Sequence, residues 1–248
     1  MTVFLSVVIP AYNEEARIGA ALEKVRTYLG HQRYTAEVIV VENASTDRTA
    51  AIVEAAASSP GVPVRLLRLA KAGKGRAVRA GMLAAQGEFR FFADADLSMP
   101  IEQLDRFLPP VLEGVDVAIG SREAPGARRI GEPAYRHLMG RVYNAIIRVI
   151  AVDGFDDTQC GFKMFRGQAA EWLFRRQLID GWAFDIEILL LAKRQGYRVV
   201  EVPIDWYHGD QSKVRPIRDT VTMLAETVRI RLNALRGRYP APVERRAR

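Results

Sequence analysis

The sequence has little of what cross-links a small protein or holds a structural metal. Its 248 residues include one cysteine, Cys160, and three histidines. One cysteine excludes a disulfide within the chain, and so few thiol and imidazole groups argue against a structural zinc site. The fold must therefore rest on a hydrophobic core, for which a chain of this length is sufficient.

Long apolar runs are also missing. No stretch approaches the ~18 uninterrupted apolar residues of a membrane-spanning helix, and the run at residues 146–152 is broken by Arg148. The apolar run at residues 4–10 is too short for a signal peptide and lacks a cleavage site. With 49% hydrophobic residues and a mean hydropathy of -0.05, the composition is typical of a soluble globular protein. We expect a cytoplasmic chain.

The excess positive charge is confined to the C-terminus. The formal net charge is +7, and residues 213–248 alone hold ten basic and three acidic residues, so the first 212 residues are balanced. Residues 216–236 combine an apolar stripe at helical spacing with several arginines, which predicts a basic amphipathic helix. The stripe consists of Ile217, Val221, Leu224, Val228, Leu232 and Leu235, and the arginines are Arg218, Arg229, Arg231 and Arg236, with Arg238 just beyond.

A helix of this kind, assigned to residues 215–238, is typical of proteins that lie on an anionic membrane, where each basic residue contributes about 1 kcal/mol. Two alternatives are that the stripe packs on the core of the domain or that the helix binds nucleic acid. Nucleic acid is the weaker alternative, because the chain has no nucleic-acid-binding motif. We expect residues 239–248 to form a disordered tail.

The first half of the chain alternates between strand and helix patterns. Apolar runs predict strands at residues 4–9, 37–41, 64–69, 89–93 and 115–120. Helices are expected between them, the first capped by Asn13 and the later ones at residues 48–57, 74–85 and 101–112. This alternation predicts a mostly parallel central sheet flanked by helices. The second half is less regular, with helices expected at residues 134–151 and 184–195 and strands at 161–166 and 199–205.

Two carboxylates follow the fourth predicted strand. Asp94 and Asp96 lie where the buried run ends, and in open α/β sheets ligands bind beyond the carboxyl ends of the strands. Two unpaired charges beside a buried strand are costly, whereas Mg²⁺ or Mn²⁺ takes oxygen ligands and shares them with a phosphate. The alternative is that both aspartates are turn and cap residues, because Asp-x-Asp is a short motif.

Polar residues follow three other predicted strands. Residues 12–15 follow the first strand, Glu42 and Asp47 follow the second, and Lys74 begins the helix after the third, where anions bind. Each of these alone is a turn or a helix start, and residues 73–75 do not form a Walker motif. Together they bring carboxylates and a cation to one crevice.

These motifs resemble, in order and spacing, those of the family-2 glycosyltransferases, and the second half is similar to the branch that glycosylates polyprenyl and dolichyl phosphates. The resemblance covers about residues 4–214. It implies one GT-A (Rossmann-like) α/β domain over residues 1–214, with a donor half at about 1–121 and an acceptor half at about 122–214. The matching segments are residues 7–15, 40–49, 73–75, 94–96, 120–122, 157–163, 182–187 and 212–213.

The resemblance implies an inverting, metal-dependent hexosyltransferase that uses a nucleotide sugar, Mg²⁺ or Mn²⁺, and a polyprenyl or dolichyl phosphate. It would act as a peripheral protein on the inner face of the membrane. Glucose from UDP-glucose is favoured over mannose from GDP-mannose, because mannose-specific relatives often carry glutamine where this chain has Ser98. Glu42 stands where the family usually has aspartate, which leaves the nucleobase open.

The resemblance also assigns roles to donor-side residues. Asp96 and Asp94 would bind the metal, with Asp94 facing the ribose or the water shell of the metal. Glu42 would meet the edge of the base. The remaining donor-binding residues would be Pro10, Tyr12, Asn13, Glu14, Asp47, Lys74 and Ala95.

The acceptor determines the chemistry. A phosphate monoester has a second pKa near ~6, so it is already an anionic nucleophile that needs cations rather than a strong base. Arg122 and Arg136 would bind this phosphate, and Asp157 would act as a base or, as we favour, as an orienting group. Further acceptor or lid residues would be Gln159, Trp182, Asp185 and Lys213, with Asp185 equally suited to cap a helix.

Two other functions stay open at this point. A glycosyltransferase with a sugar hydroxyl as acceptor would need a real general base, and its rate would depend steeply on the pH through a carboxylate. A nucleotide-binding protein or nucleotidyltransferase would share the fold class. Nucleotidyltransferases of this shape have a glycine-rich, arginine-containing loop after the first strand, and residues 11–14 do not form such a loop.

Overall fold

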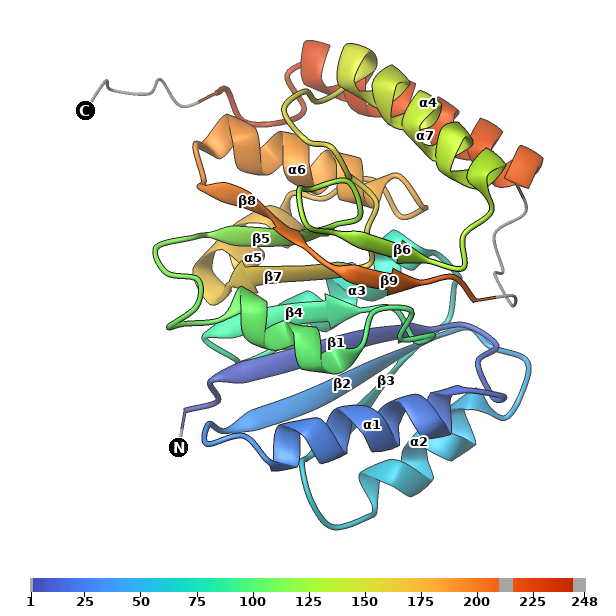
Figure 1. The fold of residues 1–248 in the computed structure, drawn as a ribbon, viewed down its shortest axis with the longest axis vertical. Coiled ribbons are helices and arrows are strands. Elements are labelled where there is room, and N and C mark those ends of the chain that lie inside the picture. The colour runs from blue at the N-terminus through green and yellow to red at the C-terminus, as the bar shows by residue number, and fades with distance from the viewer. Residues whose placement is uncertain (1, 210–215, 243–248) are drawn as a thin grey trace.

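A seven-stranded sheet forms the centre of the protein, of which the computed structural model describes residues 2–209 and 216–242. The strand order is β3-β2-β1-β4-β7-β5-β8 (Figure 1). Strand β7 is antiparallel to both of its neighbours and all other pairs are parallel, which confirms the mostly parallel sheet. The strands are β1 (Leu5–Ala11), β2 (Ala36–Asn43), β3 (Val64–Leu69), β4 (Phe89–Ala93), β5 (Val117–Ser121), β7 (Phe162–Arg166) and β8 (Val199–Pro203).

Helices cover both faces of the sheet, because successive strand residues point to opposite sides. Val7 and Ile9 of β1 lie in the core on one face, and Val8 lies in the core on the other. All three are fully buried. The first face is covered by α1 (Ile18–Gly30), α2 (Thr49–Ala57) and the 3₁₀ helix η1 (Ile101–Phe107), and the second by α3 (Lys74–Ala84), α5 (Gly167–Arg175) and α6 (Phe184–Gln195).

Two further helices lie side by side outside these layers, α4 (Ala134–Ile150) and α7 (Pro216–Leu235) (Figure 1). They contact each other, and α7 also contacts α6. The segment before α4 contains β6 (Arg128–Ile130), which pairs in parallel with β9 (Asp205–Tyr207). Strands β8 and β9 therefore replace the single strand predicted at residues 199–205. Among the described helices, none combines the length and apolar character that crossing a bilayer requires.

Two helices differ from their predicted extents. Helix α1 begins at Ile18 and its N-cap is Arg17, so the predicted N-cap at Asn13 is wrong; Asn13 has a φ of +52° and its side chain accepts a hydrogen bond from the loop after β2. The helix predicted at residues 101–112 is a 3₁₀ segment that ends at Phe107. The Pro109–Pro110 pair that follows lacks the backbone N–H groups of a longer helix.

The C-terminal helix packs on the domain with a face other than the predicted apolar stripe. Thr227, Ile230 and Asn233 are at most 2% exposed. Four stripe residues are instead 41–69% exposed, so the stripe is not the packing face that one alternative required: Val221, Val228, Leu232 and Leu235. Leu224 is half-buried, and the side chain of Ile217 lies outside the described part.

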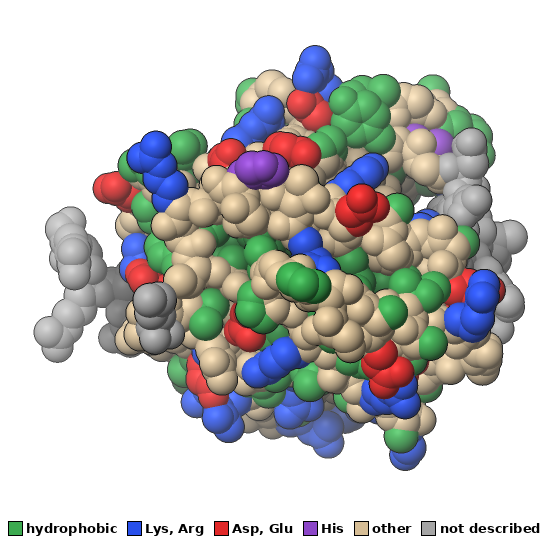
Figure 2. Space-filling model, turned by 90° about the horizontal axis from the view of Figure 1, so that it is seen from below, with side chains coloured by type: hydrophobic (Ala, Val, Ile, Leu, Met, Phe, Trp, Pro, Cys, Tyr) green, Lys and Arg blue, Asp and Glu red, His purple; other side chains and the backbone are tan. Residues whose placement is uncertain are grey.

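Helix α4, beside α7, exposes an apolar face of its own, which the sequence analysis did not single out. Its exposed residues are 51–87% accessible and are Tyr135, Leu138, Met139, Val142 and Val149. The surface over α1 and α2, at the other end of the molecule, carries acidic and basic side chains interspersed with small apolar groups (Figure 2). We call these five residues of α4, together with the exposed stripe residues of α7, the apolar platform.

The tail predicted from residue 239 begins with a packed side chain. Tyr239 is 4% exposed, and its hydroxyl donates a hydrogen bond of 2.6 Å to Glu187 Oε1. The prediction of disorder is thus wrong for Tyr239, because its ring fills space against α6. Residues 243–248 lie outside the described part.

Candidate active site

Two adjoining cavities lie where the carboxyl ends of β1, β2 and β4 meet the first turn of α3. The first, which we call the strand cavity, has a volume of about 470 Å³. The second, the helix cavity, reaches α4 and α7 and measures about 600 Å³. The two share a wall and form one cleft, lined from both sides by Arg17, Lys74, Asp94, Asp96 and Trp182.

The strand cavity gathers most of the predicted donor-binding residues. Asn43 of β2 also lines it, and its Oδ1 accepts a hydrogen bond of 3.0 Å from the backbone N of Gly73. This bond connects the loop after β3 to the end of β2, so it holds these two parts of the cavity wall together. The predicted residues in this wall, apart from those that both cavities share, are Pro10, Tyr12, Glu14 and Ala95.

Three predicted donor-binding residues, Asn13, Glu42 and Asp47, lie outside the walls of both cavities. Asp47 Oδ1 accepts a hydrogen bond of 3.0 Å from the backbone N of Thr49, the first residue of α2. Glu42 accepts one from the backbone N of Ser45, and Asn13 Oδ1 accepts one from the loop after β2. Each of the three fixes a loop of the cleft, and a direct contact with a nucleotide stays a prediction.

Lys74 and Asp94 form an ion pair at the centre of the cleft. Lys74 Nζ lies 2.7 Å from Asp94 Oδ1 and 5.2 Å from the ring centre of Trp182. Burial lowers the pKa of Lys74, but Asp94 and Asp185 raise it by more, so the ammonium stays charged. The pair holds a cation at the N-terminus of α3, where anions bind.

Asp96 is the member of the carboxylate pair without a cation at contact distance. Its Oδ1 accepts a hydrogen bond of 3.0 Å from Ser98 N, and within the described residues no lysine or arginine nitrogen forms an ion pair with it. Desolvation in the cleft and the charge of Asp94 raise the pKa of Asp96. A cation between Asp96 and a phosphate would remove this cost, so the oxygen ligands available fit Mg²⁺ or Mn²⁺.

The protein side chains alone do not complete such a metal site. In the part of the chain that the structure describes, no three histidine, cysteine, aspartate or glutamate side chains converge on one point. Mg²⁺ in proteins is often held by one or two carboxylates together with substrate phosphates. Asp96, with Asp94 beside it, is suited to this kind of shared site.

Arg122 and Asp157 bind each other. Arg122 Nε donates to Asp157 Oδ2 at 2.7 Å, Nη2 donates to Oδ1 at 2.9 Å, and the backbone N of Arg122 donates to Oδ2 at 3.0 Å. Burial raises the pKa of Asp157, but Arg122 lowers it further, to about 2. A carboxylate with this pKa is a weak base, which favours the orienting interpretation of Asp157 over the base.

Asp157 lies behind the cleft and not in its wall. Its side chain is 5% exposed and lines a separate cavity of about 160 Å³, which also touches Arg122 and Arg136. That Asp157 sits beside the reacting atoms therefore stays a prediction. The carboxylate points at the guanidinium of Arg122, because a buried charge needs a partner.

The helix cavity contains both predicted phosphate-binding arginines, Arg122 and Arg136. The guanidinium of Arg122 lies 5.5 Å from the ring centre of Trp206 and already forms its bidentate pair with Asp157. Arg136 forms no ion pair within the described residues; its Nε is 3.4 Å from the hydroxyl oxygen of Tyr135. Arg136 is therefore the freer of the two cations. The predicted acceptor or lid residues Gln159, Trp182 and Asp185 line the same cavity.

Asp185, predicted as an acceptor-site residue or as a helix cap, forms a buried ion pair that the sequence did not predict. Lys163 Nζ lies 2.7 Å from Asp185 Oδ1, and the two side chains are 1% and 4% exposed. Burial raises the pKa of Asp185, and Lys163 lowers it only in part. The carboxylate is thus a partner of Lys163 and not a cap of α6. Lys213, predicted in the same group, lies outside the described residues.

Several wall residues were not expected from the sequence. Arg17 lines both cavities, and its Nη2 donates a hydrogen bond of 3.0 Å to Glu14. Trp206 and His208 reach the helix cavity through the β6–β9 pairing, which no local pattern reveals. The apolar residues of α4 recur at helical spacing, so Tyr135 and its neighbours could have been found. Helix α7 adds Thr220 and Met223.

The lone cysteine also lines the helix cavity. Burial raises the pKa of the Cys160 thiol to about 12, so the thiol stays protonated and is no nucleophile at neutral pH.

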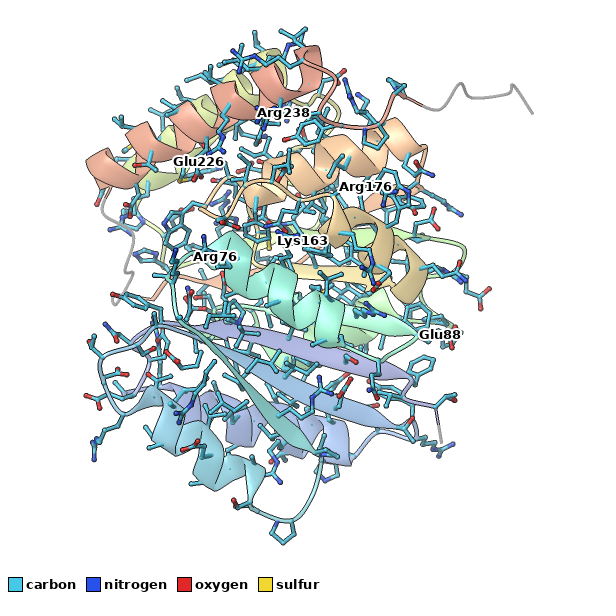
Figure 3. The ribbon with its side chains drawn as sticks, turned by 180° about the vertical axis from the view of Figure 1, so that it is seen from behind. Arg76, Glu88, Lys163, Arg176, Glu226 and Arg238 are labelled. Carbon is cyan, nitrogen blue, oxygen red and sulfur yellow. The ribbon has the colours of Figure 1, made fainter. Side chains whose placement is uncertain are left out.

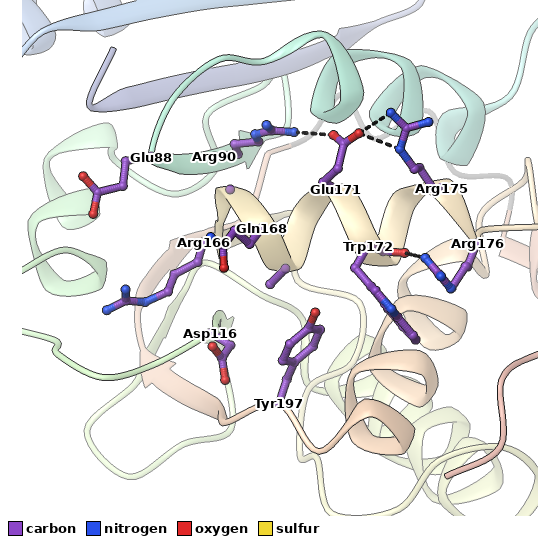
Figure 4. A pocket seen from close by; sticks show the side chains of 12 residues that line it. Glu88, Arg90, Asp116, Arg166, Gln168, Glu171, Trp172, Arg175, Arg176 and Tyr197 are labelled. Carbon is purple, nitrogen blue, oxygen red and sulfur yellow. Dashed lines mark hydrogen bonds and ion pairs between the residues drawn. The ribbon is translucent and has the colours of Figure 1, made fainter. Parts of the chain in front are cut away.

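A further cavity, of about 820 Å³, lies at the other ends of the strands (Figure 4). Its wall includes Glu88, which precedes β4, and Asp116, which precedes β5. Within this wall, Glu171 accepts hydrogen bonds from both Arg90 and Arg175. No predicted site residue lines this cavity. The candidate active site is therefore the cleft at the carboxyl ends of the strands.

The fold and the cleft define a class of enzyme. A mostly parallel sheet, a polar cleft at its carboxyl ends, an aspartate suited to a divalent cation and a lysine at a helix N-terminus fit a site that binds phosphate groups together with a divalent cation. The sequence profile of the Glycosyl transferase family 2 matches residues 6–174. The chain belongs to this family and is a hexosyltransferase.

Relatives and solved structures agree with this assignment. The chain is 36% identical over 226 residues to dolichyl-phosphate beta-glucosyltransferase of Drosophila melanogaster, covering 86% of this chain and 69% of the relative. It is 32% identical over 249 residues to the human protein of the same name, covering 95% and 77%.

The GT-A fold is confirmed by a solved structure, glucosyl-3-phosphoglycerate synthase from Mycobacterium tuberculosis in complex with UDP. The TM-score is 0.66 at 19% identity, over 92% of this chain and 80% of that one. Another structure of the same synthase contains Mn²⁺, UDP and glucosyl-3-phosphoglycerate, with a TM-score of 0.62, 18% identity and coverage of 98% and 82%. GT-A neighbours thus bind a divalent metal together with UDP.

Proposed function

We propose that the protein transfers glucose from UDP-glucose to a polyprenyl phosphate of the dolichyl type, with inversion at the anomeric carbon. The relatives named dolichyl-phosphate beta-glucosyltransferase support the sugar and the acceptor. The observation that carries the proposal is the position of Arg122 and Arg136 in the helix cavity, which adjoins the strand cavity on one side and reaches the apolar platform on the other.

The donor would occupy the strand cavity. Its volume of about 470 Å³ lies within the range of small-molecule sites. Lys74 offers a positive charge to the diphosphate at the N-terminus of α3, where backbone N–H groups add to the attraction. Asp96 and Asp94 would hold Mg²⁺ or Mn²⁺ there, and the cation, when bound, would stabilise the charge that develops on the leaving diphosphate.

The acceptor would enter through the helix cavity with its phosphate toward Arg136 and Arg122. An oxygen of this phosphate forms the new bond to the anomeric carbon, while the bond to the nucleotide diphosphate breaks and its electron pair leaves with the diphosphate. A dianionic phosphate has no proton to lose, so the step needs no general base. The low pKa of Asp157, about 2, supports this acceptor over a sugar hydroxyl.

The lipid chain would leave the site over the apolar platform. Tyr135 and Met139 of α4 belong both to the helix cavity and to this exposed face. Exposed arginines accompany the platform on α7, including Arg229, Arg231 and Arg236. Apolar area together with positive charge favours the surface of an anionic bilayer, and this proposal extends the predicted membrane-interface helix at residues 215–238 to α4.

Nucleotide binding tests the donor half of this proposal. We expect UDP and UDP-glucose with Mn²⁺ to raise the melting temperature, by about 5–10 °C at a hundred-fold excess over the dissociation constant. GDP and GDP-mannose should have much smaller effects, and EDTA should abolish the shift. An equal shift with GDP would contradict the choice of UDP, and no shift with any nucleotide would contradict the proposed function itself.

A further inference from the structure

The loop between α5 and α6 lies against the first turn of α3. The backbone N of Gly75 donates to Gly181 O at 3.1 Å, and the backbone N of Arg76 donates to Asp180 O at 3.1 Å. The side chains of Arg76 and Asp180 also form an ion pair of 2.5 Å. Lys74 belongs to the same turn of α3, so these contacts fix the position of the loop relative to the lysine backbone.

Helix α7 holds the other side of this loop through one carboxylate. Glu226 Oε2 accepts a hydrogen bond of 2.9 Å from the backbone N of Ala183. A Cβ atom on Gly181 would lie 1.9 Å from Glu226 Oε1, so the carboxylate occupies the space that only glycine leaves free. Figure 3 shows Glu226 on the side of α7 that faces the domain. Burial raises the pKa of Glu226.

The residue between these two contacts is Trp182, which lines both cavities. Its ring centre lies 5.2 Å from Lys74 Nζ, which is paired with Asp94. A chain of contacts thus runs from Glu226 on α7 through the loop to the cation at the centre of the cleft.

A second contact fixes the start of the same loop. Glu187 of α6 accepts hydrogen bonds of 2.9 Å from the backbone N atoms of Leu178 and Ile179, and it also accepts the hydroxyl of Tyr239 at 2.6 Å. The segment after α7 therefore acts on residues 178–179, while α7 itself acts on residues 181–183. The C-terminal segment holds the loop at both ends.

We infer that Glu226 is a positioning residue that sets Trp182 and Lys74 for the donor diphosphate, so that the seating of α7 on the domain controls nucleotide binding. The inference rests on the proposed function, which puts the nucleotide in the strand cavity. It gives α7 a second role, because the helix that carries the exposed apolar stripe also shapes the donor site. A shift of α7 on a membrane would then change the affinity for the donor.

The test measures the binding of UDP in the presence of Mn²⁺ to the purified full-length protein by calorimetry, without an acceptor. We expect Glu226→Ala to weaken binding about 10- to 100-fold, because each 1.4 kcal/mol lost from the contact of the cation with the diphosphate lowers the affinity tenfold. Glu226→Gln keeps an oxygen that accepts the Ala183 hydrogen bond, so it should recover binding to within about threefold. Glu54→Ala, which removes an exposed carboxylate paired with Arg68, is the matched control and should bind normally.

A double-mutant cycle separates positioning from a general loss of stability. Gly181→Ala should weaken UDP binding in the wild-type background, but it should add little in the Glu226→Ala background, because the carboxylate that it collides with is gone. A role in stability alone would lower the melting temperature of Glu226→Ala and leave the affinity of the folded protein unchanged, which would overturn the inference. If Glu226→Ala does not fold, Glu226→Gln and Gly181→Ala decide: normal binding by Gly181→Ala contradicts the inference.

The outcomes distinguish this inference from the proposed function. A wild-type protein that binds no UDP would overturn both. If the wild-type protein binds UDP and folded Glu226→Ala binds it equally tightly, the inference is overturned and the proposed function is not.

Discussion

The two sides of the cleft are built in different ways. On the donor side, the loops after β1, β2 and β3 are held by backbone N–H groups that donate hydrogen bonds to side-chain oxygens of Asn13, Glu42, Asn43 and Asp47. On the acceptor side, α4 and α7 present apolar side chains that are more than 40% exposed, and Arg136 has no ion-pair partner in the described structure. The loops of the donor side are thus fixed by internal hydrogen bonds, whereas the acceptor side exposes apolar surface and a cation without an ion-pair partner among the described residues.

This difference fits two ligands of different character. A nucleotide sugar is polar and of fixed size, and a pre-organised site binds it without the cost of ordering loops. A prenyl chain is long and apolar and stays partly in the membrane, so its site needs a charged group for the phosphate and a surface that faces lipid. If the two sides are independent, a substitution on one side should leave ligand binding on the other side unchanged.

The largest effect is expected at the metal-binding aspartate. Asp96→Asn should lower turnover about a thousandfold or more, because it removes a charged ligand from the cation that neutralises the leaving diphosphate. Steady-state kinetics with Mn²⁺ titrated over a wide range measures this loss. Asp153→Asn, at an exposed surface ion pair, is the control. Wild-type turnover by Asp96→Asn, or by the wild type in EDTA, would exclude the metal from the reaction.

The next effect concerns the arginine that is free to bind the acceptor. Arg136→Ala should lower turnover with a short-chain prenyl phosphate by about 30- to several-thousand-fold, the range for losing one partner of a buried charge pair. The affinity for UDP should change little. Arg136→Lys keeps the positive charge but lacks the planar guanidinium that binds phosphate in a bidentate way. Its turnover should therefore lie between those of the wild type and Arg136→Ala.

Arg122→Ala is a different experiment, because it leaves Asp157 buried without a partner. We expect this variant to lose activity and also about 3–5 kcal/mol of stability, and thermal unfolding would detect the loss of stability.

For Arg136, the contradicting result is a variant Arg136→Ala that no longer binds UDP but keeps its acceptor kinetics. Arg136 would then belong to the donor side.

A smaller effect is expected on membrane binding. Replacing Leu138, Val142 and Val149 of the apolar platform by glutamine should weaken binding to anionic vesicles by about 10- to 100-fold, at roughly 1 kcal/mol or less for each partly buried side chain. High salt should weaken it further through screening. Val111→Gln is the control, because Val111 is 67% exposed elsewhere on the surface. Co-sedimentation that none of these changes alters would show that the platform does not bind membranes.

The smallest effect is a pH dependence of stability. The pKa of Asp157 is about 2 in the folded protein and ordinarily 3.8. A depressed pKa contributes stability above pH 3.8 that is lost as the pH falls toward 2, by about 2 kcal/mol for this shift. Asp157→Asn should therefore be less stable overall, but its free energy of unfolding should fall less steeply between pH 4 and pH 2. Parallel curves for both proteins would show that Asp157 does not titrate in this way.

The donor side was largely predictable from the sequence. Apolar runs that end at Asp94, Glu42 and Tyr12 mark strand ends, and parallel strands bring their ends to one edge of a sheet. The direction in which each side chain points could not be predicted from local patterns. Glu42 and Asp47 turn toward backbone N–H groups, because a carboxylate in a tight loop is stabilised by the nearest donors.

The acceptor side was less predictable, because its contacts join distant segments. Arg122 meets Asp157 across 35 residues and Lys163 meets Asp185 across 22, and no spacing rule gives such pairs. The apolar stripe of α7 was found by its period, but its exposure and the packing of Thr227, Ile230 and Asn233 depend on α4 and α6. Tyr239 was assigned to a tail, because terminal position outweighed an aromatic side chain that fills a gap.

The central claim is that a phosphate monoester accepts the sugar, and product analysis tests it most directly. The purified protein would be incubated with UDP-glucose, Mn²⁺ and either a short-chain prenyl phosphate or the prenol of the same length, and the product would be identified by phosphorus and proton NMR. We predict a β-glucosyl phosphate diester from the prenyl phosphate and no product from the prenol. Transfer to the prenol, or an α-linked product, would contradict this account.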